Sequence, residues 1–355
     1  MSGRGSIVRW AIWLLAGAAA IVVIGLALLV WPGRPGAART LRFVGFTPLP
    51  AHKTLNVLDY LSIYGPWLFA TSESGGEIFR VTLGPGAPER ATVAVLPGAP
   101  ATHGVVIDPA SGLAFVTRSE VNAVDVFDPG AMRFIRRIPV AADPDGIFYD
   151  PADRLIWADS GDSKLATVID PATQAKVGVV VLGGSPEFAA FDAPTGRLYQ
   201  NLKDVNEVAV VDIPGGRVVE RWPLPGCGGP TGMAIDAPDR RLFVVCSRNA
   251  RLVILDLRSG REAAMLPIGG GPDSVAYDAA LRRIYATGIA GVLTVDAQTG
   301  PDTYRQLDRI RLHFGAHTLA VDPATHRVYV GYAGLLVPPR LAVFDAIGPG
   351  VAAGN

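Results

Sequence analysis

The fold of this chain is most clearly predicted by residues 145–186, which read DGIFYDPADRLIWADSGDSKLATVIDPATQAKVGVVVLGGSP. This stretch contains four short apolar runs, at residues 147–149, 155–158, 165–169 and 177–182, and each run is followed by Pro, Gly, Asp or Ser. Short apolar runs punctuated in this way are typical of strands joined by tight turns. The stretch therefore predicts a unit of four strands.

The same unit recurs along the chain. The Asp that ends its first strand reappears at Asp108, Asp150, Asp192, Asp236, Asp278 and Asp322, at intervals of 42, 42, 44, 42 and 44 residues. A second series, which ends the third strand, falls at Asp128, Asp170, Asp212, Asp256, Asp296 and Asp345. A four-stranded unit cannot bury both of its faces alone, and repeats of about forty residues indicate blades packed around an axis. The pattern predicts an all-β protein, a β-propeller.

The repeat gives seven blades. The first is the least regular, with strands expected at residues 59–64, 67–71 and 77–83, whereas the seventh has only three, at residues 318–321, 328–331 and 341–344. Residues 41–46, which read LRFVGF, precede the first blade and have no other partner. We expect them to supply the missing strand of the seventh blade and to close the ring. The propeller is then residues 40–346, followed by a C-terminal tail at residues 347–355.

The blade pattern resembles the YVTN-repeat β-propeller family, which includes YncE-like proteins. The second strand, Tyr-Val-Thr-Asn-like in that family, reads FVTR at residues 115–118, YATG at 285–288 and YVGY at 329–332, and the third strand reads TVID at 167–170. The resemblance covers about residues 50–345. It implies the fold but no single function, because proteins with this scaffold bind many different partners.

The charge balance argues against polyanionic partners. The chain has 32 basic and 32 acidic residues and a pI near 7.0, so it has no general attraction to DNA or anionic lipid. YncE-like relatives have been associated with DNA binding, but nucleic acid is not an expected partner of this chain.

The first 39 residues differ in kind from the rest. Residues 1–9 contain Arg4 and Arg9, and residues 10–31 follow without a charge, with Trp at both margins. At 1.5 Å per residue, a helix of this length spans a bilayer core of about 30 Å. We expect a cytoplasmic N-terminus at 1–9, a transmembrane signal anchor at 10–31 and a tether at 32–39. The propeller, being of an exported type, would face the periplasm or cell exterior from a bacterial inner membrane.

The two cysteines also favour export. Cys227 lies just before the first strand of blade five, and Cys246 ends the second strand of the same blade. Adjacent strands of a blade are antiparallel, so the end of the second lies beside the start of the first. We therefore expect a disulfide between them, formed in an oxidising compartment.

One position of the repeat gathers ionisable residues at the channel. The start of each innermost strand rims the central channel of a propeller at one face. That position is occupied by Asp59, His103, Asp145, Glu187, Thr231, Asp273 and His317. In one interpretation these side chains are simply solvated in a wet channel, and no ligand is implied. Tyr60, in turn, is expected to pack between blades.

In the other interpretation the ring binds a metal. His317, Asp59 and His103 fall on blades seven, one and two, which are neighbours in a closed ring, and their side chains suit zinc, copper or iron. Calcium held by Asp145, Glu187 and Asp273 is a weaker version.

The leading functional prediction is a binding scaffold that presents its channel face to a small ligand or an extracytoplasmic protein, rather than an enzyme. The alternative is a metal-dependent hydrolase, lactonase-like, in which Glu187 or Asp145 acts as the base. A redox propeller is a further alternative. The absence of Asn from the ring counts against a lactonase, because lactonase propellers use Asn as well as carboxylates.

Overall fold

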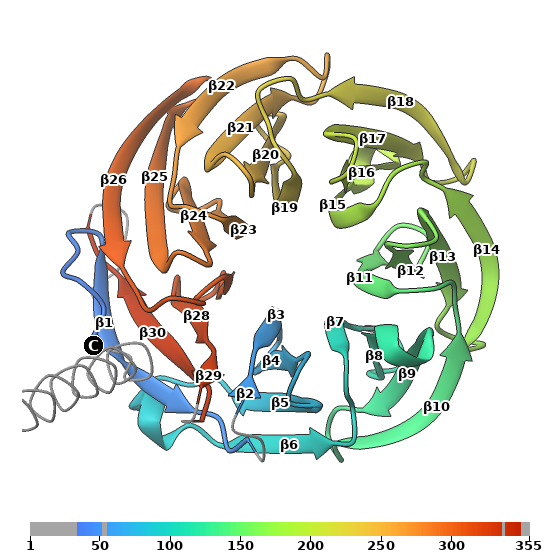
Figure 1. Ribbon diagram of the computed structural model, residues 1–355, viewed down its shortest axis with the longest axis horizontal. Helices are drawn as coiled ribbons and strands as arrows, with labels where there is room; N and C mark the ends of the chain where they lie inside the picture. Colours follow the sequence, from blue (N-terminus) through green and yellow to red (C-terminus); the bar gives the residue numbers. More distant parts are fainter. Residues whose placement is uncertain (1–33, 52–54, 336–337, 349–355) are drawn as a thin grey trace, which may run out of the picture.

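Seven four-stranded antiparallel sheets form a closed ring around a central channel (Figure 1). The computed structural model describes residues 34–51, 55–335 and 338–348. The predicted all-β, seven-bladed propeller is confirmed. In blades one to six the chain runs from an innermost strand at the channel to an outermost strand at the perimeter, and then passes to the next blade.

The strands occupy equivalent positions in blades one to seven. The innermost strands are β3 (Leu58–Tyr64), β7 (Thr102–Ile107), β11 (Pro144–Asp150), β15 (Pro186–Asp192), β19 (Pro230–Asp236), β23 (Pro272–Asp278) and β27 (Thr318–Val321). The second strands are β4 (Trp67–Ser72), β8 (Ala114–Arg118), β12 (Leu155–Ser160), β16 (Arg197–Leu202), β20 (Arg241–Cys246), β24 (Arg283–Gly288) and β28 (Val328–Tyr332). The third strands are β5 (Glu77–Thr82), β9 (Ala123–Asp128), β13 (Leu165–Asp170), β17 (Glu207–Asp212), β21 (Arg251–Asp256), β25 (Val292–Gly300) and β30 (Arg340–Ala346).

The outermost strands complete the blades. They are β6 (Val93–Pro97), β10 (Arg133–Pro139), β14 (Ala175–Val181), β18 (Arg217–Pro223), β22 (Glu262–Pro267), β26 (Thr303–Arg311) and, in blade seven, β1 (Leu41–Pro48). A short pair, β2 (Leu55–Asn56) and β29 (Gly334–Leu335), joins blades one and seven, and the single-turn helices are η1 (Pro88–Arg90), η2 (Ser119–Val121) and η3 (Ala193–Thr195).

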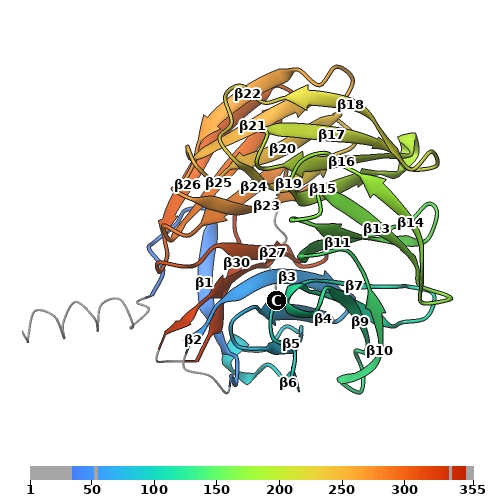
Figure 2. The same ribbon diagram turned by 45° about the vertical axis from the view of Figure 1, so that its right-hand side comes forward.

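The first strand of the chain closes the ring, as predicted. β1 pairs antiparallel with β30, with Leu41 opposite Ala346 and Pro48 opposite Arg340, and Figure 2 shows the two strands side by side. Phe43 of β1 packs against Phe344 of β30, which fixes the register through apolar contact as well as through the ladder. Blade seven is thus built from both ends of the propeller.

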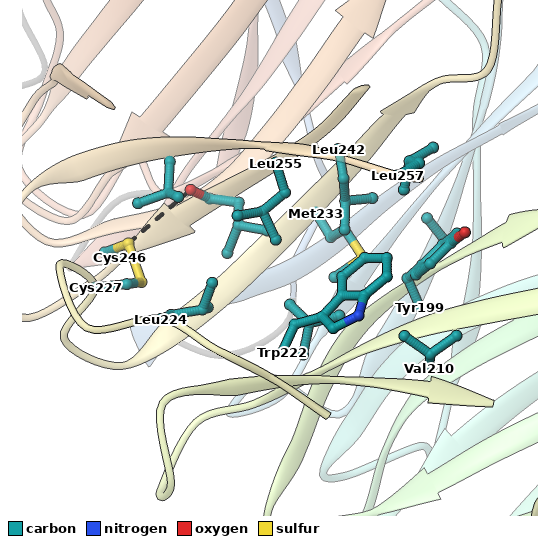
Figure 3. Packing of buried hydrophobic residues seen from close by; sticks show 14 residues of the cluster. Tyr199, Val210, Trp222, Leu224, Cys227, Met233, Leu242, Cys246, Leu255 and Leu257 are labelled. Atoms are coloured by element: carbon teal, nitrogen blue, oxygen red, sulfur yellow. Dashed lines mark hydrogen bonds between the residues drawn. A yellow bond between two sulfur atoms is a disulfide. The ribbon is translucent and has the colours of Figure 1, made fainter. Parts of the chain in front are cut away.

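Apolar side chains fill the spaces between blades. Between blades four and five, Trp222 packs on Tyr199 with ring centroids 5.2 Å apart, and Met233 and Leu242 complete the same cluster (Figure 3). The second strands are the most buried, because both of their faces lie against neighbouring blades; every residue of β20 and β24 is buried. This explains why these strands read as continuous apolar runs in the sequence.

The repeated Asp residues cap the turns on the face opposite the channel mouth. The Asp108 carboxylate, for example, accepts hydrogen bonds from the backbone N–H groups of Ala110 and Ser111. Others join neighbouring blades: Asp192 pairs with Arg240 at 2.5 Å, and Asp278 accepts a hydrogen bond from His326. His326 of blade seven is half-buried and bonds to Asp278 of blade six.

The predicted disulfide is present. Cys227 and Cys246 are joined across 19 residues of sequence, and both lie in the core between blades four and five (Figure 3). Among the residues that the structure describes, no helix is long and apolar enough to cross a membrane. The predicted anchor at residues 10–31 lies outside the described residues.

Removing the disulfide should lower stability by about 3 kcal/mol, because a loop of this length loses that much chain entropy in the unfolded state when it is cross-linked. A Cys227→Ala/Cys246→Ala double variant should therefore unfold at lower denaturant concentration than the oxidised protein. A reductant should lower the midpoint of the wild type and leave that of the variant unchanged. An equal midpoint for the variant and the oxidised wild type would contradict the prediction.

Candidate functional site

A β-bulge interrupts the strand pairing at the ring position in β3, β7, β11, β15, β19 and β23, whereas β27 pairs regularly. In blade three, Pro144 pairs with Ser160 and Ile147 with Ala158, so Asp145 and Gly146 together oppose Asp159 alone. Bulges of this kind redirect a side chain away from the regular alternation of a strand. Innermost strands β7, β15 and β19 have the same two-residue irregularity, and β23 has a one-residue one.

The ring residues form an acidic cup at the channel mouth. The cup has a volume of about 250 Å³ and is lined by Asp59, Tyr60, Glu73, His103, Asp145, Glu187, Phe188, Lys203, Asp273, Ser274 and Thr318. Five of the seven residues predicted from the repeat therefore meet in one site. The other two, Thr231 and His317, are not among the lining residues.

Local hydrogen bonds hold these two residues away from the cup. The buried hydroxyl of Thr231 donates to the carbonyl oxygen of Pro272 in the next blade. Nδ1 of His317 lies 2.9 Å from the carbonyl oxygen of Gly315, two residues earlier. Thr231 and His317 therefore occupy ring positions without lining the cup.

Two aromatic rings form the floor of the cup. Tyr60 of blade one and Phe188 of blade four stack with centroids 4.9 Å apart and an interplanar angle of 20°. Their strands, β3 and β15, lie on opposite sides of the channel (Figure 1), so the stacked pair crosses it below the rim. The prediction that Tyr60 packs between blades was incomplete, because the residue after the ring position also lines the cup in blades one and four, where it is Tyr60 and Phe188.

The Tyr60 hydroxyl lies among carboxyl groups. Its pKa is raised well above the ordinary value, first by burial and then by the charges of Asp145, Asp59, Glu187 and Asp273. The phenol therefore stays protonated and can donate a hydrogen bond to any anion or carboxylate in the cup.

His103 links two of the carboxylates. Its Nδ1 lies 2.5 Å from Oδ2 of Asp59 and 3.5 Å from Oδ1 of Asp145, and its Nε2 lies 2.9 Å from the Ser119 hydroxyl. Burial opposes the imidazolium, but the hydrogen bond to Asp59 and the charge of Asp145 outweigh it and raise the pKa of His103 to about 9. Oδ1 of Asp145 is buried without a hydrogen-bond partner, and burial followed by the charge of Asp59 raises the pKa of this carboxyl.

The structure brings together a group of possible metal ligands that differs by one residue from the predicted set. Ligand atoms of Asp59, His103 and Asp145 all lie within 4.8 Å of one another, and this is the group of metal-ligating side chains that the described residues bring together. Asp145 of blade three, not His317 of blade seven, joins the predicted pair Asp59 and His103. The physical reason is the turn at residues 315–317, in which the His317 ring lies within hydrogen-bond distance of the carbonyl oxygen of Gly315.

Glu187 is held by a lysine that the sequence analysis missed. Nζ of Lys203 lies 2.6 Å from Oε1 of Glu187. Burial raises the pKa of Glu187, which Lys203 partly offsets. A similar balance holds at Asp273, where burial raises the pKa and His317 lowers it.

A second repeat position could have identified the missed residues. The residue directly after each second strand lies beside the start of the innermost strand, since the two strands are antiparallel. That position is occupied by Glu73, Ser119, Gly161, Lys203, Ser247, Ile289 and Ala333. Glu73 and Lys203 line the cup, and Ser119 bonds His103. Neither repeat position includes Asp159. This residue is fully buried, and burial raises the pKa of its carboxyl well above the ordinary value.

The fold is shared with known structures. It is similar to a chain of Kuenenia stuttgartiensis Hydrazine Synthase, with a TM-score of 0.70 and 18% identity, over 84% of this chain and 97% of that chain. It is also similar to a chain in the crystal structure of the Mitotic Checkpoint Complex, with a TM-score of 0.67 and 12% identity, over 89% of this chain and 94% of that one. No protein-family profile and no curated protein matches the sequence. At these identities the likeness shows the propeller fold, a common scaffold for binding, and nothing finer.

His103 should titrate far above an ordinary imidazole. In metal-free protein, kept so with a chelator, we expect its C–H resonances in NMR to report a pKa of about 9. The folded pKa lies above the unfolded value of about 6.5, so this group's contribution to the free energy of unfolding is fully present below about pH 6.5 and is lost as the pH rises through the folded pKa. Asp59→Asn should return the pKa of His103 toward the ordinary value. A wild-type imidazole that titrates near pH 6 would contradict this geometry.

Proposed function

We propose that this protein is a membrane-anchored binding propeller that takes a positively charged group of its ligand into the acidic cup. One observation carries the proposal: five carboxyl groups and only two basic side chains line a cavity of about 250 Å³. The chain as a whole has no net charge, with 32 basic and 32 acidic residues, so the acidity is a property of this site. A cavity lined mostly by one sign of charge concentrates ligands of the opposite sign.

The floor of the cup narrows the ligand class. Tyr60 and Phe188 place aromatic rings beneath the carboxylates. Aromatic faces attract organic cations as well as apolar groups, so a carboxylate rim over an aromatic floor suits an amine, an alkylammonium group or a basic side chain. The volume accommodates a small molecule, or one side chain of a protein partner inserted from the channel mouth.

The cellular setting is part of the proposal. The YVTN-like strands, the uncharged run at residues 10–31 and the export expected for such propellers support a YncE-like protein anchored in a bacterial inner membrane, with the propeller on the extracytoplasmic side. The disulfide between Cys227 and Cys246 fits an oxidising compartment.

A series of compounds with one carbon skeleton tests the charge preference. Among a small amine, the corresponding alcohol and the corresponding carboxylate, we expect only the amine to bind by calorimetry and to raise the melting temperature. Asp273→Asn combined with Glu73→Gln should weaken that binding about tenfold or more, because each replacement removes a charged acceptor from the cup. Asp153→Asn, an exposed change in a turn on the opposite face, is the control and should have no effect. Preferential binding of the alcohol or carboxylate would refute the proposal.

A divalent metal is a second candidate occupant, favoured by the cluster of Asp59, His103 and Asp145. Imidazole and carboxylate ligands suit zinc, copper or iron, and Oδ1 of Asp145 makes no hydrogen bond and lies 3.5 Å from Nδ1 of His103. A hydrolytic or redox function has less support. Asp145 belongs to the ligand cluster and Glu187 is paired with Lys203, so both predicted bases are already engaged.

Metal content distinguishes the structural cluster from the one predicted from sequence. If the site binds an ion, elemental mass spectrometry of protein purified without chelators or a polyhistidine tag should find about one equivalent per chain. His103→Ala, Asp59→Asn and Asp145→Asn should each abolish it, whereas His317→Ala should retain it, because His317 lies outside the cluster. Metal retained in the His103→Ala variant would exclude this site.

A further inference from the structure

The chain joins the propeller at the same face as the cup. The backbone N–H of Gly36 donates to the carbonyl oxygen of Arg311, at 2.8 Å. Arg311 ends β26 and pairs with Val292, and Val292 pairs with Gly288. Gly288 in turn pairs with Pro272, the residue before the rim residue Asp273. Gly36 is therefore at the channel-mouth edge of blade six.

From there the chain crosses the blade to the opposite face. The backbone N–H groups of Arg39 and Thr40 donate to the carboxylate of Asp308, midway along β26. Leu41 then pairs with Ala346, at the far end of β30. Residues 36–41 are thus held against the propeller, and the distance from the predicted anchor to the propeller is set by the chain between Trp31 and Gly36.

The remaining reach is short. Five residue steps separate Trp31, the end of the apolar run, from Gly36, and they span at most about 18 Å. If residues 10–31 cross a bilayer, the mouth edge of blade six lies within about 18 Å of the end of that span.

Among the described residues, five of the nine exposed large apolar side chains lie on the same face, and the other four lie on outer strands β10, β14 and β18. Ile289 is 51% exposed and Phe314 is 61% exposed, and the two are adjacent, because the N–H of Gly315 donates to the carbonyl oxygen of Ile289. Both belong to the loops at the mouth edge of blade six, where Gly36 is attached. Val121, Val181 and Val205 are exposed at the mouth edges of other blades. Among the residues described, the turns of the opposite face carry no large exposed apolar side chain.

We propose that the mouth face of the propeller rests on the membrane that holds its own N-terminal segment, with Ile289 and Phe314 immersed in the interfacial layer. The proposal rests on the anchor that is part of the proposed function. The lipid surface is the partner, because the point of attachment at Gly36 and the pair Ile289 and Phe314 lie on one edge of one blade. Apolar contact, not charge, would drive the association, since the chain is neutral and the cup is acidic. The cup would then open toward the membrane and receive a cation presented at or near it.

Depth-dependent fluorescence quenching of the full chain in vesicles tests the proposal. Both native cysteines are in the disulfide, so one introduced cysteine gives one labelling site. We expect labels at Ile289→Cys and Phe314→Cys to be quenched several-fold more by lipid-attached nitroxides than labels at Ala280→Cys or Arg305→Cys. Ala280 is in an exposed turn on the opposite face of the same blade, and Arg305 is exposed on its perimeter strand.

A second variant separates apolar contact from the constraint of the tether. Ile289→Ser combined with Phe314→Ser should reduce quenching of a label at Val205→Cys on the same face. Val219→Ser, which removes an exposed apolar side chain from outer strand β18, should not.

Four outcomes would overturn the proposal. Stronger quenching at Arg305 would place the propeller edge-on, and stronger quenching at Ala280 would invert it. Quenching that rises with the protein-to-lipid ratio would mean that a second copy covers the apolar pair. Full chain that does not float with vesicles would refute the anchor, and with it this inference, while leaving cation binding in the cup to its own calorimetric test.

Discussion

A blade of this propeller has two apolar faces, and it can bury both only between two other blades. This constraint is why the first strand of the chain completes the last blade. Without β1, the edge of β30 and the apolar side chain of Phe344 would be exposed. The pairing of Leu41 with Ala346 converts a row of seven units into a ring in which each unit has two neighbours.

Ring closure also creates the site. The innermost strands converge on a narrow channel, and a Cβ atom on Gly232, next to the ring position of blade five, would lie 2.5 Å from the carbonyl oxygen of Asp273 in blade six. In so little space the side chains of different blades must contact one another. Asp59 of blade one therefore bonds His103 of blade two, and Tyr60 stacks on Phe188 across the channel.

The two faces of the propeller have different chemistry. On one face, turns capped by Asp are joined across blades by ion pairs such as Asp192 with Arg240. On the other, the acidic cup is surrounded by loops that expose single apolar residues such as Phe314. Charged turns that bond neighbouring blades stabilise the ring. Carboxyl groups that are clustered despite their mutual repulsion are more typical of a cation-binding site. This asymmetry supports assigning binding to the mouth face.

The number of blades, the strand order within them, the closing strand and the disulfide could be predicted from the sequence, because each depends on periodicity and on the antiparallel order of strands. The sequence also placed Asp59, His103 and Asp145 in one ring. The folded structure was needed to show that Asp145 rather than His317 completes the cluster with Asp59 and His103. It was also needed to show that Tyr60 and Phe188 stack at the cup. A repeat fixes where a residue lies around the axis. The direction of its side chain depends on local bulges and carbonyl groups, and contacts across the channel depend on how closely the innermost strands converge, which no spacing in the sequence records.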